Sequence, residues 1–315
     1  MGSSNLLIER CPREERARAM AIVYRGLGRG MRAALVEQAL EDERAGRVDL
    51  SGLWIARRGG GGRIVGAVLT QALPGRATAV WAPRTTAAWG KGRAETAAAL
   101  VRGTLEGLRG EGIAIAQAVL DVPVDPREAE DLAAGGMPHV TDLVYLRRST
   151  AVPPPPPPSS SVRFDWRGMD QVGEEALRAA LESSYTDSLD IPEIGGARSI
   201  DDALQGHRGA PGYRPELWRL GSVDGEPDVA AVLLLAAAAD RDSWEVVYLG
   251  LTPAARGRGL GVQAVAHALE LARPRVAAIE LAVDARNLPA AKLYAATGFV
   301  PFDRRAVHLA VLSRP

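Results

Sequence analysis

The hexapeptide RGRGLG, from Arg256 to Gly261, lies between an apolar run and a run of helix-forming residues. The preceding run, EVVYLGL, is typical of a strand, and the following run, VQAVAHALELA, is typical of a helix. A glycine-rich turn at such a junction lets several backbone N–H groups point at one spot, and the helix dipole favours negative charge there. Arg256 and Arg258 add two positive charges. The hexapeptide therefore predicts a phosphate or pyrophosphate site, with an ordinary strand-to-helix turn as the alternative.

A second pattern follows this helix. Apolar and polar residues alternate in IELAVDARN, which indicates a strand, and Asn287 is placed to cap the short helical run LPAAKLYAAT that Gly298 ends. The first pattern is R-x-x-G-x-G and the second is N-x-x-A-x-x-L-Y-x-x-x-G-F. In this order, separated by one helix and one strand, they closely resemble the GCN5-related N-acetyltransferases (GNAT). The second pattern rests on Asn287, Ala290, Leu293, Tyr294, Gly298 and Phe299.

Length and composition narrow the class of protein. The 315 residues are enough for two domains, and the 38 basic and 38 acidic residues give no net charge that would favour nucleic acid or an anionic membrane. The single cysteine excludes an intrachain disulfide and a cysteine-based zinc site. The four histidines are scattered along the sequence, which argues against a metal site. The chain lacks an apolar run of about 20 residues and a signal-like N-terminus. We expect a cytoplasmic monomer or homodimer with no metal, nucleic-acid or membrane partner.

The run AVPPPPPPSSS, residues 151–161, divides the chain into two similar halves. Consecutive prolines favour an extended spacer, so we expect domains over 1–150 and 162–315 with this linker between them. Each half contains two strands around a glycine-containing hairpin, at Leu53–Leu69 and at Leu217–Leu235. This similarity indicates an internal duplication. The expected fold class is α/β (α+β): two tandem GNAT-like domains, each a mixed twisted sheet flanked by helices, with a coenzyme-binding splay between central strands.

The two copies differ at the residues that carry the resemblance. Aligning Gly92 with Gly259 places Trp89 at the position of Arg256 and Ala94 at that of Gly261. Leu132 falls where the second half has Tyr294, and the run ATAVWAP offers no carboxylate in place of Glu245. We therefore expect the first domain to be a degenerate, structural copy and the second to be the catalytic domain.

The resemblance implies acetyl-CoA as cosubstrate. Its pyrophosphate would rest on the backbone N–H groups of the hexapeptide, and its pantetheine arm would pair with the preceding strand and contact Asn287. The positions that match are Leu249, Gly250, Leu251, Arg256, Gly257, Arg258, Gly259, Leu260, Gly261 and Asn287. A missing side chain at Gly250 would let another backbone approach closely, although a simple bulge is the alternative explanation.

Acyl transfer to an amine needs one proton removed and one supplied. Tyr294 matches the family position next to the thioester sulfur, which predicts a general acid, against the alternative of a packing tyrosine. Glu245 opens the strand before the hexapeptide and, by period 2, is expected to share a face with Val247, Leu249 and Leu251. We take Glu245 as the candidate base, with a solvated charge as its alternative and Asp284 in reserve.

The acceptor is expected at the segment Ser183–Arg208, which holds several acidic residues. Such charge favours an amino-bearing small molecule or peptide, and Tyr185, Asp190 and Glu193 are its candidate contacts, with a solvated loop as the alternative. The tandem plan also resembles mycothiol synthases, which acetylate an amino-sugar conjugate. A non-catalytic acyl-CoA sensor is a further alternative. G-x-G-x-G spacing argues against a dinucleotide-binding oxidoreductase, and the lack of Gly-Lys-Ser/Thr excludes a P-loop.

Overall fold

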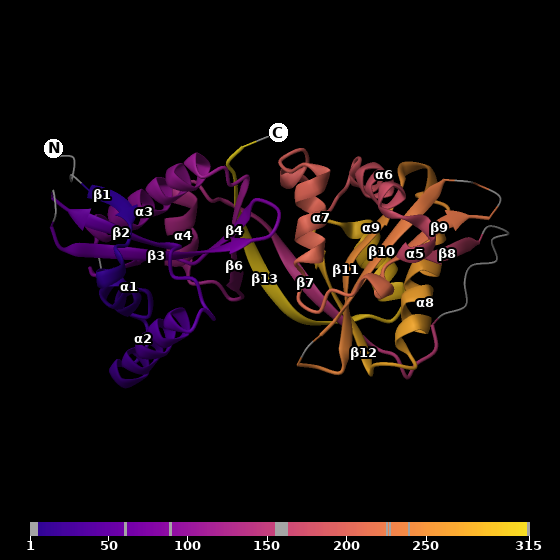
Figure 1. The fold of residues 1–315 in the computed structure, drawn as a ribbon, viewed down its shortest axis with the longest axis horizontal. Helices are drawn as coiled ribbons and strands as arrows, with labels where there is room; N and C mark the ends of the chain where they lie inside the picture. Colours follow the sequence, from indigo (N-terminus) through magenta and orange to yellow (C-terminus); the bar gives the residue numbers. More distant parts are fainter. Residues whose placement is uncertain are drawn as a thin grey trace. The chain divides into compact units, whose positions relative to one another are not determined.

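The chain forms two compact units in a computed structural model. The structure describes residues 6–59, 62–87, 90–154, 163–224, 226, 228–238 and 240–313. The first unit comprises Met1–Val140 and Ala306–Pro315, and the second comprises Thr141–Arg305. Each contains a mixed sheet flanked by helices, as the ribbon in Figure 1 shows. The α/β fold class expected from the sequence is therefore present in both units.

In the first unit the strands follow one another across the sheet, and the pairs β1–β2, β2–β3 and β3–β4 are antiparallel whereas β4–β6 is parallel. Their order is β1 (Leu6–Arg10), β2 (Leu53–Arg58), β3 (Ile64–Leu73), β4 (Ala77–Val80), β6 (Ile115–Asp121) and the end of β13 (Val300–Val311), with β5 (Arg84–Thr85) beside β3. The helices are η1 (Arg13–Glu15), α1 (Arg16–Val23), α2 (Arg29–Arg44), α3 (Lys91–Gly110) and α4 (Pro126–Gly135).

The second unit repeats this plan around one parallel pair, β11–β12. Its strands lie in the order β7 (His139–Ser149), β12 (Ala278–Asp284), β11 (Ser243–Leu251), β10 (Val229–Ala237), β9 (Arg219–Val223) and β8 (Phe164–Gly168). The helices are α5 (Met169–Val172), α6 (Glu174–Tyr185), η2 (Pro192–Ile194), α7 (Ile200–Arg208), η3 (Pro215–Leu217), η4 (Pro253–Ala255), α8 (Leu260–Ala272) and α9 (Leu288–Ala296).

Helices cover both faces of the second sheet, which explains the unbroken apolar run of β10. On one face, Leu233 and Leu235 of β10 belong to a core cluster with side chains of α8 and α9, including Leu269 and Tyr294. On the other face, Val232 and Leu234 belong to a cluster with side chains of α6 and α7. Successive side chains of β10 are thus buried on alternate faces of the sheet.

The parallel strands β11 and β12 separate partway along their length. They pair only where Ser243–Glu245 lies beside Ala278–Glu280, and both strands then continue without pairing to each other. Strand β11 also contains a bulge, since its register against β10 shifts between Leu234 and Leu235. The opening between β11 and β12 is the feature of the fold that creates the site.

The compact units differ in extent from the ranges expected from the sequence, 1–150 and 162–315. Strand β7 pairs with β12 from Leu143 to Ser149, so this segment belongs to the second unit. Conversely, Ala310 and Leu312 at the end of the chain are buried in the core of the first unit. Strand pairing and burial, rather than the proline run, set the extents of the units. Of the predicted linker, residues 155–161 lie outside the described residues, as do Trp89 and Gly225.

Candidate active site in the second unit

A cavity of about 730 Å³ lies in the second unit where β11 and β12 separate. Its wall is completed by the N-terminus of α8, by helix α9 and by residues 187–190, which we call the segment that follows α6. The lining residues are Ser184, Asp187, Ser188, Leu189, Asp190, Val246, Val247, Tyr248, Leu249, Gly250, Leu251, Arg256, Gly257, Gly259, Gly261, Val262, Leu281, Ala282, Val283, Asn287, Pro289, Ala290, Leu293 and Tyr294. Most of the positions predicted from the two sequence patterns thus line one cavity.

The hexapeptide forms the turn that starts α8. Gly257 and Gly259 have φ angles of 73° and 76°, a conformation that glycine adopts without steric cost. Gly259 is the N-cap of α8 and provides no side-chain cap, and Leu260 is the buried first residue of the helix. Within the described part of the chain, the N–H groups of Gly257, Gly259 and Gly261 have no backbone acceptor. These free donors at a helix N-terminus suit a phosphate group.

The two arginines of the hexapeptide lie differently from the sequence expectation. Arg256 donates from Nε to the Leu251 carbonyl at 3.1 Å and from Nη2 to the Ser184 carbonyl at 2.9 Å. Its guanidinium therefore connects the end of α6 to the end of β11. Arg258 donates to Glu226 at 3.3 Å and is not part of the cavity wall. In this structure the backbone of the turn, rather than the arginine side chains, offers the donors for an anion.

Tyr294 projects from α9 into the cavity. Its side chain is buried, packs edge-on against Phe299 with ring centroids 5.6 Å apart, and makes no hydrogen bond to the described residues. Burial raises the pKa of its hydroxyl, and the charge of Asp190 adds to the rise. The phenol therefore stays protonated at neutral pH and can donate its proton. Asn287, which also lines the cavity, caps α9 by accepting the Ala290 N–H at 3.2 Å.

The predicted coenzyme strand is β11, and Leu249, Gly250 and Leu251 all line the cavity. A Cβ atom at Gly250 would overlap the hydroxyl of Tyr248, two residues earlier. The Tyr248 hydroxyl hydrogen-bonds Ser184 Oγ at 2.8 Å. Gly250 is therefore needed to accommodate Tyr248 within the strand. Tyr248 and Ser184 were not predicted from the sequence, because a tyrosine in an apolar strand carries no local signal of a cavity.

Glu245 lies outside the cavity wall. Val246 and Leu249 both pack in the cluster beneath α8, although they are three residues apart, because the bulge inserts one extra residue between them. The expectation that Glu245 shares a face with Leu249 and Leu251 is therefore wrong. Glu245 is solvent-exposed beside Glu280 of β12, and partial burial raises its pKa.

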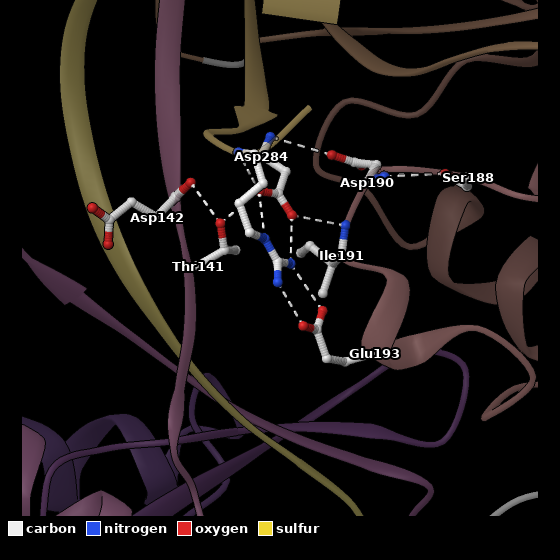
Figure 2. Close-up of polar contacts among 8 residues, drawn as sticks. Thr141, Asp142, Ser188, Asp190, Ile191, Glu193 and Asp284 are labelled. Carbon is white, nitrogen blue, oxygen red and sulfur yellow. Dashed lines mark hydrogen bonds and ion pairs between the residues drawn. The ribbon is translucent and has the colours of Figure 1, made fainter. Parts of the chain in front are cut away.

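Asp284, the reserve base, is fully buried at the end of β12. It accepts hydrogen bonds from Thr141 Oγ1 at 2.5 Å, from the Ile191 N–H at 3.0 Å and from Arg286 Nη2 at 2.8 Å. Figure 2 shows Thr141 and Ile191 converging on its carboxylate. Burial alone would raise its pKa, but the hydrogen bonds from Arg286 and Thr141 lower the pKa of Asp284 to about 2. Asp284 is therefore an ionised anchor whose oxygens are already engaged.

The predicted acceptor residues lie in different surroundings. Asp190 lines the cavity, and its Oδ1 accepts the backbone N–H of Asp284 at 3.2 Å. Glu193 forms a two-pronged ion pair with Arg286, at 2.6 and 2.9 Å. The Tyr185 hydroxyl hydrogen-bonds His207 Nε2 at 2.6 Å, away from the cavity wall. Of these three predicted contacts, Asp190 alone lines the cavity.

The corresponding region of the first unit is built differently. Helix α3 follows Gly90, whose φ is 90°, but Leu132 on α4 is fully buried at the position that corresponds to Tyr294. Arg93 at the start of α3 pairs with Asp131 of α4 at 2.5 Å. An internal ion pair and an apolar side chain therefore occupy positions where the second unit has free donors and a phenol.

Two further properties bear on cofactors and surroundings. Within the described ranges, no group of three or more His, Cys, Asp or Glu side chains is arranged to hold a metal ion. The described helices include none that combines the length and the apolar character needed to cross a membrane.

Comparison with known proteins agrees with this geometry. Residues 201–299 match the acetyltransferase (GNAT) family. Over 114 residues the chain is 36% identical to the mycothiol acetyltransferase of Beutenbergia cavernae. These aligned residues make up 36% of this chain and 37% of that relative. The chain therefore spans little more than a third of the length of this curated relative.

Solved structures extend the likeness to the whole fold. A GCN5-related N-acetyltransferase from Sphaerobacter thermophilus matches with a TM-score of 0.55 and 18% identity, over 98% of this chain and 96% of that one. A GCN5-related glucosamine N-acetyltransferase region of a fungal multi-domain GH3 β-N-acetylglucosaminidase matches with a TM-score of 0.53 and 16% identity, over 98% of this chain and 38% of that one.

The chain thus has two units that share the fold of these solved structures, and the second unit carries the cavity. The match to the acetyltransferase (GNAT) family, over residues 201–299, lies within this second unit.

Proposed function

We propose that the chain is an N-acetyltransferase that transfers an acetyl group from acetyl-CoA to a primary amine of a small molecule or peptide. One observation carries the proposal. One cavity holds a helix N-terminus, the open edges of two separated parallel strands and the hydroxyl of Tyr294. Among the described residues, neither the N–H groups at this helix N-terminus nor the hydroxyl has a hydrogen-bond partner. These three features are, respectively, a site for phosphate, a site for an extended amide-containing arm, and a proton donor for a leaving group.

The residues present fit acetyl-CoA. The N–H groups of Gly257, Gly259 and Gly261 would hold its phosphates, and the backbone of Leu249 to Leu251 would pair with its amide-containing arm. Asn287 lines the same cavity. When bound, the thioester supplies an activated acetyl group. The protein's part is to orient that group at the point where β11 and β12 separate.

Tyr294 supplies the proton that the departing sulfur needs. The raised pKa of its hydroxyl keeps the phenol in its protonated form until the carbon–sulfur bond breaks. Glu245 remains the sequence-based candidate for removing the proton from the amine. Because Glu245 lies outside the cavity wall, a role for it would require a water molecule between its carboxylate and the amine.

A second candidate function is acetylation of an amino-sugar conjugate, as in mycothiol synthases. The 36% identity to a mycothiol acetyltransferase over 114 residues supports it. The segment that follows α6 also brings carboxylates to the cavity, which suits a cationic amino group. The sensor alternative is less well supported, because binding alone needs no proton donor, whereas the Tyr294 phenol is buried in the cavity without a hydrogen-bond partner among the described residues.

Release of free thiol from acetyl-CoA tests the proposal. The protein would be offered amino-sugars, aminoglycosides, polyamines and peptide N-termini in parallel, with acetyl-CoA binding measured by calorimetry. We expect thiol release with at least one amine. Binding of acetyl-CoA without release in any arm would favour the sensor, and absence of binding would contradict the proposal.

A further inference from the structure

The cavity contains two carboxylates, Asp187 and Asp190, and they differ in what surrounds them. The charge of Asp190 raises the pKa of both Tyr248 and Tyr294, which places its carboxylate within electrostatic reach of the two phenols. Asp187 exerts no such effect on Tyr294, and its backbone carbonyl accepts a weak hydrogen bond from Arg256 at 3.5 Å. Asp190 is therefore the carboxylate that shares the reacting end of the cavity with Tyr294.

The position of Asp190 is built into the fold. Its Oδ1 accepts the Asp284 N–H at 3.2 Å, and its own N–H donates to Ser188 Oγ at 3.2 Å. The next residue, Ile191, has a φ of 43°, which is strained for a β-branched side chain. The Ile191 N–H bound to Asp284 holds this strained backbone in place. Figure 2 shows Asp190 and Ile191 both held against Asp284.

One oxygen of Asp190 is left for a ligand. Among the described residues, its Oδ2 accepts no hydrogen bond, whereas Oδ1 is held by Asp284. Asp190 is a solvent-exposed residue, but the surrounding protein desolvates its carboxyl group and so raises its pKa. The nearby Asp284 charge adds to the rise, while the Asp284 N–H and Arg286 oppose it. The other titratable groups that face it are Tyr248 and Tyr294. A carboxylate with a raised pKa and a free oxygen is a suitable proton acceptor.

We propose that Asp190 binds the ammonium group of the acceptor and removes its first proton, with Asp284 as the residue that positions it. This inference rests on the proposed acetyltransferase function and names the substrate class, a cationic primary amine. It also assigns the proton acceptor to the segment that follows α6 rather than to Glu245 on β11.

The proton balance is complete with the groups named. The ammonium transfers one proton to Asp190 Oδ2, which later releases it to solvent. The freed nitrogen lone pair forms the carbon–nitrogen bond while the carbon–sulfur bond breaks. Tyr294 donates its proton to the departing sulfur, and the second proton lost from nitrogen restores the Tyr294 phenol through water. The net products are an amide, a thiol and one proton.

Asp190→Asn tests the assignment, because asparagine keeps an oxygen that can accept the Asp284 N–H and so preserves the local fold. Glu182→Gln, an exposed carboxylate on α6 outside the cavity, is the matched control. Acetyl-CoA affinity, kcat/KM for the amine and the pH profile would be measured for each full-length protein. We expect Asp190→Asn to lower kcat/KM about 10²- to 10⁴-fold and to lose the acidic limb of the profile, with coenzyme affinity unchanged. Glu245→Gln should keep that limb.

The outcomes separate this inference from the function on which it rests. Turnover by the wild type together with an unchanged kcat/KM in Asp190→Asn would overturn the assignment of Asp190 alone. Equal loss of coenzyme affinity and turnover in Asp190→Asn would also overturn it, since that pattern indicates a structural role. A wild type that releases no thiol with any amine would contradict the proposed function itself, and this inference with it.

Discussion

Removal of the Tyr294 hydroxyl is expected to leave the packing of the site almost unchanged. In Tyr294→Phe the ring keeps its edge-on contact with Phe299, and the hydroxyl makes no hydrogen bond to lose among the described residues. We expect turnover to fall about 10- to 1,000-fold with acetyl-CoA affinity unchanged, since only proton donation is lost. A thiol-release assay measures turnover, and calorimetry measures acetyl-CoA affinity. Full turnover across the amine panel would contradict the role of Tyr294 as acid.

The lowered pKa of Asp284 determines how we expect the free energy of unfolding to depend on pH. Its pKa is lowered from 3.8 to about 2, and at about 1.36 kcal/mol per pH unit this corresponds to about 2 kcal/mol. Because the folded pKa lies below the unfolded one, this stabilisation is present above pH 4 and is lost as pH falls towards 2. Asp284→Asn should therefore unfold more easily at pH 7 and show a shallower loss between pH 4 and 2.

Urea unfolding at a series of pH values measures this dependence for Asp284→Asn. Glu182→Gln serves as its control, because Glu182 is exposed on α6 and should leave the curve unchanged. Parallel pH curves for the wild type and Asp284→Asn would show that the buried carboxylate does not set the acid limb of stability.

Individual site residues were predictable where a backbone requirement or a motif marks them. Gly257, Gly259 and Asn287 take the turn and cap positions expected, because their conformations follow from local sequence. The positions of Arg256 and Glu245 could not be obtained in this way. The partners of Arg256 are carbonyl groups distant in sequence, and the bulge that turns Glu245 away depends on pairing with β10.

At the scale of elements, Arg256 joins α6, β11 and the segment that follows α6. The sequence suggested a phosphate contact, whereas the structure shows donation to the carbonyls of Leu251 and Ser184. These two hypotheses make opposite predictions for Arg256→Lys. A lysine keeps the positive charge, but its point-like ammonium cannot reproduce the forked donation of a guanidinium.

We expect Arg256→Lys to behave like Arg256→Ala rather than like the wild type. Both variants should increase amide hydrogen exchange over residues 184–191, because the carbonyls of Ser184 and Asp187 lose their hydrogen bonds from the Arg256 guanidinium. Exchange measured by mass spectrometry, with α9 as the internal reference, checks this. A lysine variant with normal exchange and normal coenzyme affinity would instead support the charge-based role.

The opening between β11 and β12 illustrates what element patterns can and cannot predict. Alternation and turn residues correctly indicate β12, α8 and α9 from sequence alone. The two adjacent parallel strands pair over three residues and then separate, and this separation is a property of their packing. The splay was anticipated only through the family resemblance.

At the scale of the whole molecule, similarity between the halves indicated two units of one fold, and both are present. The extents of the units were not predictable from the proline run. That run marks an extended spacer, but whether β7 precedes or follows a domain boundary depends on which strand it pairs with. Leu146 of β7 is buried in the core of the second unit, and Leu312 in that of the first.

This composition of the units predicts which fragments fold. A fragment of residues 162–315 lacks β7, so β12 loses its partner from Leu143 to Ser149 and the core loses Leu146. A fragment of residues 141–305 keeps both. We expect the fragment 162–315 to aggregate without binding acetyl-CoA, because the loss of β7 turns β12 into an exposed edge strand and uncovers apolar surface. The fragment 141–305 should unfold cooperatively and bind acetyl-CoA within about tenfold of the full chain. Calorimetry and thermal unfolding of both fragments distinguish them. A stable, coenzyme-binding 162–315 would show that β7 is dispensable to the second unit.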